Sequence, residues 1–186
     1  MSLETNTKKP IKSHDDLIEI IDQTGIKHEL IDGKIIMMSG GSKRHSEISL
    51  NLAIILKSSL KDTDCKVYNS DVKLVVKKEH NHNYYFPDVS VECNESINDK
   101  DSVLENPFIL AEVLSDSTAS INKVKKLNDY LTIPNLKGYL IISQKVKLIE
   151  LWKTTGEVET LISGDTVEIS EEIKLKVDEV YNGISL

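Results

Sequence analysis

The apolar residues of the chain recur at two different spacings, and each change of spacing marks a predicted element. In residues 13–24 and again from about 42 to 60, apolar side chains recur every three or four positions, which is the spacing of one helix face. Ser13 can cap the first of these helices, and Gly25 ends it. The first third of the chain is therefore predicted to contain two amphipathic helices.

Strand-like patterns dominate the rest. In residues 28–38 the Asp32-Gly33 pair lies between two apolar runs, which is a strong short-range signal for a β-hairpin. Pro87 interrupts one of the later apolar runs, so the strand there follows the break. The other strands are expected at 67–68, 72–76, 84–93, 108–114, 136–143 and 147–152.

Three further segments complete the pattern. Polar residues at 115–118 offer N-caps to a third helix that runs to about Leu131, and Pro134 closes it. Residues 94–106 are polar and resemble a loop. The tail from Glu157 alternates short strands and turns, with a helical turn near 177–181.

The order of elements indicates the fold class. The elements follow the order helix, hairpin, helix, several strands, helix and two strands. This order predicts an α/β or α+β architecture, in which one mixed sheet is flanked by helices. A chain of 186 residues suits a single domain. We expect residues 1–12 to form a loosely held arm and residues 13–186 to form that domain.

Composition removes several classes of protein. With 39% hydrophobic and 28% charged residues, the chain resembles ordinary soluble domains. No apolar run approaches the roughly 20 residues that span a bilayer, and the N-terminus lacks a signal-peptide core, so we expect a cytoplasmic protein. Cys65 and Cys93 join no Cys/His cluster. They are expected to be free thiols, with a disulfide or a metal pair as the alternative.

The charge balance bears on partners. The 23 basic residues against 30 acidic ones give a net charge of −7, and Arg44 is the only arginine. An acidic chain argues against a coat of positive charge for non-specific nucleic-acid binding, although a local basic site remains compatible with it.

One candidate site follows Pro87. On a strand, Asp88, Ser90 and Glu92 share a face while the valines between them point to the core. A carboxylate just after a proline at a strand start is well placed to hold a metal ion. Asp88 is therefore a candidate ligand.

A second carboxylate, Glu112, interrupts an otherwise apolar strand. Burying a charge there costs several kcal/mol unless it is paired or coordinated, so it either meets an ion, pairs with a lysine or lies on an exposed face. Lys126 and Tyr130 share one face of the helix that follows, although most lysine runs are simply solvated. Two carboxylates and a lysine are the groups that metal-assisted phosphodiester hydrolysis uses.

The order of these motifs resembles the PD-(D/E)XK restriction-endonuclease-like superfamily and, more closely, its Uma-type family of endonucleases. The resemblance covers roughly residues 28–182, and each string alone is common, so order and spacing carry the match. The matching pieces are Glu29-Leu30-Ile31-Asp32-Gly33, Met38-Ser39-Gly40, His45, Pro87-Asp88-Val89-Ser90-Val91, Glu112-Val113-Leu114-Ser115, Ser117-Thr118, Lys126, Tyr130 and Tyr139-Leu140-Ile141-Ile142.

The resemblance implies a restriction-endonuclease-like fold and a Mg²⁺- or Mn²⁺-dependent endonuclease. It assigns Asp88 and Glu112 as metal ligands, Lys126 as the catalytic lysine, and Glu29, His45 and Tyr130 as supporting residues. It also implies DNA as substrate and a homodimer.

The chain departs from the pattern in three places. The superfamily places lysine two residues after the glutamate, where this chain has Leu114, but members carry it on the next helix at the position of Lys126. Asn122 and Ser143 stand where members often have aspartate.

Other functions remain as alternatives. The fold could serve as a catalytically silent binding or scaffold module, dimeric or not. Against a small-molecule enzyme, the chain has no Gly-rich phosphate loop and no nucleophile elbow. His80 and His82 are a weak candidate metal pair in a polar turn. Because arginine is scarce, we expect weak DNA binding of low sequence specificity.

Overall fold

The computed structural model of the chain describes residues 13–79, 81–94, 97, 100, 102–114 and 121–186. The expected single domain contains two compact units. The first comprises the chain up to Ser39 together with Val75–Tyr85, and the second comprises Gly40–Leu74 with Phe86–Leu186.

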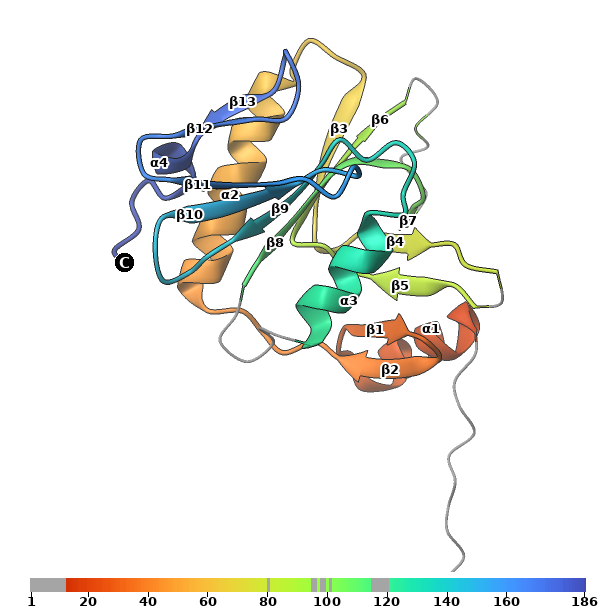
Figure 1. Cartoon of the computed structure of the whole chain (residues 1–186). Helices are drawn as coiled ribbons and strands as arrows, with labels where there is room; N and C mark the ends of the chain where they lie inside the picture. Colours follow the sequence, from red (N-terminus) through yellow and green to blue (C-terminus); the bar gives the residue numbers. More distant parts are fainter. Residues whose placement is uncertain (1–12, 80, 95–96, 98–99, 101, 115–120) are drawn as a thin grey trace, which may run out of the picture. The chain divides into compact units, whose positions relative to one another are not determined.

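In the described residues, runs of strands separate the helices along the chain (Figure 1). The helices are α1 (His14–Thr24), α2 (Lys43–Ser59), α3 (Ile121–Tyr130) and α4 (Val177–Val180). The strands are β1 (His28–Ile31), β2 (Lys34–Met37), β3 (Cys65–Asn69), β4 (Lys73–Val76), β5 (Asn83–Tyr85), β6 (Val89–Cys93), β7 (Val103–Leu104), β8 (Pro107–Val113), β9 (Gly138–Ile142), β10 (Leu148–Trp152), β11 (Val158–Ile162), β12 (Thr166–Glu168) and β13 (Lys174–Lys176).

The first unit confirms the predicted helix and hairpin. The Ser13 hydroxyl accepts from the Asp16 backbone N–H, and the Asp16 carboxylate accepts from the Ser13 N–H, which forms a capping box. Gly25 ends α1 with φ 66°, a left-handed conformation that glycine adopts at little cost. β1 and β2 pair in antiparallel register through a turn in which Asp32 and Gly33 both have positive φ.

The second unit contains the central mixed sheet that the element order predicts. Its strand order is β11-β10-β9-β8-β6-β3, in which β8 and β9 run parallel and the other neighbours antiparallel. The first half of β4 pairs in parallel with the short strand β7, and β12 pairs with β13 in a separate two-stranded sheet.

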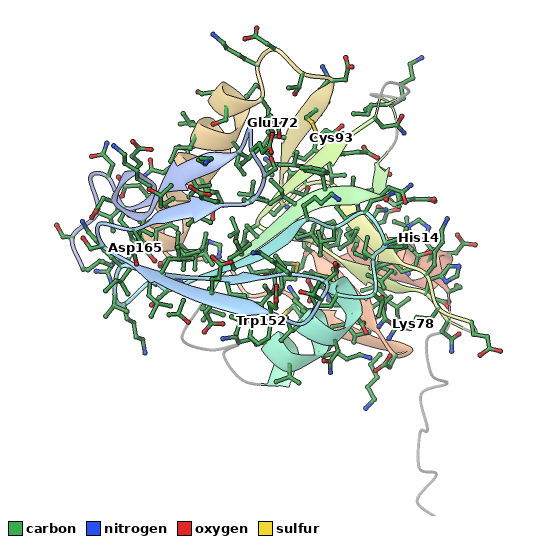
Figure 2. The ribbon with its side chains drawn as sticks, turned by 45° about the horizontal axis from the view of Figure 1, so that its top comes forward. His14, Lys78, Cys93, Trp152, Asp165 and Glu172 are labelled. Atoms are coloured by element: carbon green, nitrogen blue, oxygen red, sulfur yellow. A yellow bond between two sulfur atoms is a disulfide. The ribbon has the colours of Figure 1, made fainter. Side chains whose placement is uncertain are left out.

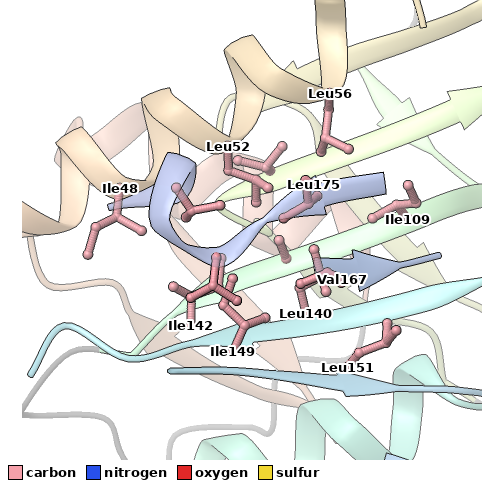
Figure 3. Close-up of a cluster of buried hydrophobic side chains, with 14 of the residues drawn as sticks. Ile48, Leu52, Leu56, Ile109, Leu140, Ile142, Ile149, Leu151, Val167 and Leu175 are labelled. Carbon is pink, nitrogen blue, oxygen red and sulfur yellow. The ribbon is translucent and has the colours of Figure 1, made fainter. Parts of the chain in front are cut away.

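The α2 helix covers one face of this sheet. Its buried residues Ile48, Leu52 and Leu56 recur at helical spacing and pack in one apolar cluster with alternate residues of the strands (Figure 3). On β8, Ile109, Ala111 and Val113 belong to this cluster. Because strand side chains alternate between faces, Glu112 points to the opposite face.

The α3 helix lies against that opposite face. Tyr130 of α3 meets Tyr139 of β9 edge to face, with ring centroids 4.9 Å apart. Lys123 of α3 donates to both carboxylate oxygens of Glu150 on β10, at 3.1 and 3.0 Å. The sheet is therefore flanked by a helix on each face, which confirms the predicted fold class.

The prediction of free thiols was wrong. Cys65 and Cys93 lie directly opposite each other in the β3–β6 ladder and form a disulfide, with Cα atoms 4.0 Å apart (Figure 2). Their pairing depends on the register of two strands, which the spacing of cysteines along the chain does not reveal.

One smaller prediction was wrong and another is not tested. Residues 103–104, expected in a loop, form β7, whose two residues are too few to produce a periodic pattern. The N-caps expected at 115–118 lie outside the described residues. None of the helices in the described part of the chain combines the length and the apolar character needed to cross a bilayer.

Candidate active site

Glu112 is the acid that interrupts the apolar pattern of β8. Its side chain is 14% exposed, and its Oε1 accepts from the Lys126 ammonium at 2.8 Å. The same oxygen accepts from the Tyr130 hydroxyl at 3.0 Å. Lys126 and Tyr130 are one helical turn apart on α3, so both reach one carboxylate. Of the alternatives for Glu112, the structure shows pairing with a lysine.

Asp88 lies immediately before β6, after Pro87. Its Oδ2 accepts from the backbone N–H of Val113 at 2.7 Å. Val113 directly follows Glu112, so this bond fixes the two carboxylates to adjacent positions of the sheet. The Asp88 side chain is 12% exposed. Both acids are thus largely withdrawn from water. Electrostatic interactions are stronger in such a buried environment than they are in water.

His45 is in the first turn of α2, which Ser42 caps by accepting from the His45 backbone N–H. Its ring Nε2 lies 3.1 Å from Oδ2 of Asp88. This hydrogen bond, together with the negative charges of Asp88 and Glu112, raises the pKa of His45 above 6.5, although burial acts in the opposite direction. His45 is therefore protonated over a wider pH range than a free histidine.

Most of the sequence-predicted residues are brought together. Asp88, Glu112, Lys126, Tyr130 and His45 form one connected group in the second unit, which we call the acid–lysine cluster. Two candidates need a separate note. Glu29 belongs to the first unit, where it is buried and lies opposite Ile36 in the hairpin. His80, of the candidate histidine pair, lies outside the described residues.

Sequence reasoning missed two groups around this cluster. One is the Lys123–Glu150 ion pair, in which Glu150 also accepts from Nε1 of Trp152 at 3.0 Å. Lys123 precedes Lys126 by one helical turn, which could have indicated a second acid on the facing sheet. The other is Gln144, which follows β9 and whose side chain donates to the backbone carbonyl of Leu114 at 2.7 Å. A polar residue in a turn gives no sequence signal.

The donor set fits a hard divalent cation. In the described part of the chain, no three or more His, Cys, Asp or Glu side chains form a ready metal cluster. Mg²⁺, however, is commonly held by one or two carboxylates, with water and substrate phosphate oxygens completing its shell. Val113 and His45 contact Asp88 at Oδ2, and Lys126 and Tyr130 donate to Oε1 of Glu112. Asp88 and Glu112 are the residues that would hold the ion.

Comparison with known proteins agrees with this fold. The model of the Uma2 family, described as “Putative restriction endonuclease”, matches residues 14–178. “Uncharacterized protein slr1290” of Synechocystis sp. (strain ATCC 27184 / PCC 6803 / Kazusa) is 34% identical over 164 residues, covering 86% of this chain and 85% of that protein. “Uncharacterized protein sll1609” of the same organism is 32% identical over 153 residues, covering 80% and 85%.

A solved structure is similar over almost its whole length. It is the crystal structure of “a putative nuclease belonging to DUF820” from Anabaena variabilis ATCC 29413, with a TM-score of 0.75 and 19% identity. The match covers 92% of this chain and 98% of that chain. At this identity the likeness shows the fold, and it confirms the nuclease-type architecture.

Proposed function

The chain belongs to the Uma2 family, and from that premise we propose that it is a metal-dependent endonuclease that hydrolyses DNA phosphodiester bonds. One observation carries the proposal: Asp88, at the entry of β6, and Glu112, on the neighbouring strand β8, are linked through Val113, and Lys126 from the facing helix pairs with Glu112. Acids that hold a cation beside a lysine are suited to hydrolysis of a phosphodiester. Family membership alone would support only the nuclease-like class.

Each residue of the acid–lysine cluster has its own proposed role. Asp88 and Glu112 would hold a Mg²⁺ or Mn²⁺ ion, which when bound polarises the phosphate and lowers the pKa of a water molecule. Lys126 holds its protonated Nζ beside Glu112, from where it can offset negative charge that develops on the phosphate or orient the attacking water.

Two further side chains fix the orientation of the acids. The buried hydroxyl of Tyr130 donates to the same Glu112 oxygen as Lys126, which restricts rotation of that carboxylate. His45 donates from Nε2 to Oδ2 of Asp88 and so leaves Oδ1 outside this bond. These two contacts hold each carboxylate in one orientation.

The charge of the chain limits how it would bind DNA. The net charge is −7, and its one arginine, Arg44, donates from Nη1 to the backbone carbonyl of Gln144 at 3.1 Å. Arginine supplies most bidentate contacts to bases, and each neutralised phosphate adds salt-dependent affinity. We therefore propose weak DNA binding with low sequence specificity.

A second function is favoured by one specific observation. In the structure, Lys126 and His45 already pair with Glu112 and Asp88, so the acids are neutralised without any metal. A nuclease fold that binds DNA without cleaving it would keep such pairs permanently. The two functions differ in whether divalent metal displaces these partners.

A plasmid-cleavage assay tests the proposal. With Mg²⁺ or Mn²⁺, the wild-type protein should nick or linearise supercoiled DNA, and Asp88→Asn should reduce the rate to background. Lys126→Met should slow cleavage by about 100-fold or more, because it removes a charge from a largely buried site. Glu159→Gln, in the exposed Lys153–Glu159 pair, is the matched control and should cleave normally. Equal cleavage by wild type and Asp88→Asn would overturn the assignment.

A further inference from the structure

Hydrogen bonds close a circuit around the acid–lysine cluster. Starting at Asp88, the circuit passes through the backbone of Val113 and Leu114, the side chain of Gln144, the hydroxyl of Ser42 and the backbone and ring of His45, and returns to Asp88. It joins the entry of β6, the end of β8, the turn after β9 and the N-terminus of α2. Neither Gln144 nor Ser42 belongs to the proposed chemistry.

The side-chain amide of Gln144 makes two bonds of this circuit, and its backbone carbonyl makes another bond outside it. Its Nε2 donates to the Leu114 carbonyl at 2.7 Å, and its Oε1 accepts from the Ser42 hydroxyl at 2.7 Å. Its backbone carbonyl accepts from Arg44 at 3.1 Å. The Leu114 carbonyl can only accept and Ser42 has one proton to give, so the direction of each bond follows from the donors available.

The turn that carries Gln144 is itself held in place. The Ser143 hydroxyl accepts from the backbone N–H groups of Lys145 and Val146, at 3.1 and 3.3 Å. The Tyr181 hydroxyl donates to the Ser143 carbonyl at 2.7 Å. Gln144 therefore projects from a fixed turn, and its bonds can transmit position from β9 to α2.

Ser42 joins this turn to His45. Its hydroxyl oxygen accepts from the His45 backbone N–H at 3.1 Å, while its proton goes to Gln144. The His45 ring also lies close to Gly41, where an added Cβ would come within 2.8 Å of ring Nδ1. Ser42, the N-cap of α2, is thus held by Gln144, and the Gly41 backbone before it lies close to the His45 ring.

We propose that Gln144 is a positioning residue that, through Ser42, holds the His45 ring on Asp88. It acts on the ring and not on the substrate. This inference rests on the proposed function only in its kinetic consequence, because the His45–Asp88 contact exists without any substrate. The competing explanation is that the Ser42 hydroxyl only caps α2. Substitutions can distinguish this capping role from the positioning of the His45 ring.

Substitutions at Ser42 make the separation. Ser42→Asp keeps an acceptor for the His45 N–H, and hence the cap, but has no proton for Gln144 at neutral pH. Ser42→Thr keeps both functions and serves as the rescue variant. Gln144→Met preserves length while removing both side-chain bonds. Gln23→Met is the matched control, because the Gln23 side chain lies on an exposed part of α1, where it donates to the Glu19 carboxylate at 2.9 Å.

The first readout is the imidazole N–H signal of His45 in proton NMR, assigned with His45→Gln. In the wild type and in Gln23→Met, the hydrogen bond to Asp88 should protect this proton from exchange and shift it downfield. Gln144→Met and Ser42→Asp should lose the signal, and Ser42→Thr should retain it. Retention in Gln144→Met, or loss in Ser42→Thr with the fold intact by circular dichroism, would overturn the proposal.

The second readout is cleavage. Gln144→Met and Ser42→Asp should lower kcat by about 10- to 100-fold with little change in KM, because a misplaced group costs rate rather than affinity. If the wild type cleaves and these variants cleave equally well, the positioning role is refuted while the nuclease stands. If the wild type does not cleave but the NMR signal behaves as described, the nuclease proposal fails and the positioning of His45 remains.

Discussion

Replacing Lys126 with methionine should destabilise the second unit strongly. The side chains of Lys126 and Glu112 are 11% and 14% exposed, so the variant removes the Lys126 charge from beside a mostly buried acid. Breaking a buried pair by removing one partner costs about 3–5 kcal/mol. Glu112 keeps its bond from Tyr130, so we expect the lower end, about 3 kcal/mol.

A distance-matched control isolates the effect of burial. Lys153 and Glu159 are even closer, at 2.6 Å, but their side chains are 36% and 48% exposed. Exposed pairs contribute about 0–1 kcal/mol, so Lys153→Met should change stability little. The double variant Glu112→Gln with Lys126→Met should recover most of the loss, because no buried charge then remains unpaired.

Urea unfolding measures the free energy of unfolding of all three variants. It can be followed by the fluorescence of Trp152, the only tryptophan, which lies in the second unit. The loss for Lys126→Met corresponds to a thermal midpoint lower by about 6–12 °C for a chain of this size. If Lys126→Met costs no more than Lys153→Met, Glu112 is well solvated in solution, and the buried acid–lysine pair is refuted.

Three further predictions concern the disulfide and two titrating groups. Reducing the Cys65–Cys93 bond should lower the free energy of unfolding by about 3 kcal/mol, measured as a shift of the urea midpoint with and without dithiothreitol. The pKa of His45 is raised above 6.5, so the stabilisation it provides is complete below pH 6.5 and is lost as pH rises through the higher folded-state value. In urea unfolding at a series of pH values, the stability gap to His45→Gln should therefore shrink as pH rises above 6.5. Hydrogen bonds from Lys147, Ser163 and the Gly164 backbone lower the pKa of Asp178 from 3.8 to about 2. Its contribution to stability is therefore present above pH 3.8 and is lost as pH falls through about 2. In acid titrations, the stability difference between the wild type and Asp178→Asn should vanish over this range.

Local features of the fold were predictable because their causes lie within a few residues. The hairpin at Asp32-Gly33 depends on two residues that adopt positive φ, and α1 begins and ends at its own capping residues. The Cys65–Cys93 disulfide was mispredicted for the opposite reason. It depends on the register of β3 against β6, which a single sequence does not encode in its spacing.

In the candidate site, too, some residues could be predicted from the local sequence and others could not. Asp88 and Glu112 were identifiable because each breaks a pattern, one after a proline and the other inside an apolar strand. Gln144 breaks no pattern, since a glutamine in a turn resembles any polar loop residue. Its importance arises only from where the β9 turn meets the N-terminus of α2.

Calorimetric titration of Mn²⁺ into the purified protein tests the central claim most directly. The wild type and the control Glu159→Gln should bind the ion at one site per chain, and Asp88→Asn and Glu112→Gln should each abolish or greatly weaken that binding. No binding to the wild type, or equal binding to all four proteins, would contradict the assignment of Asp88 and Glu112 as the metal-holding pair.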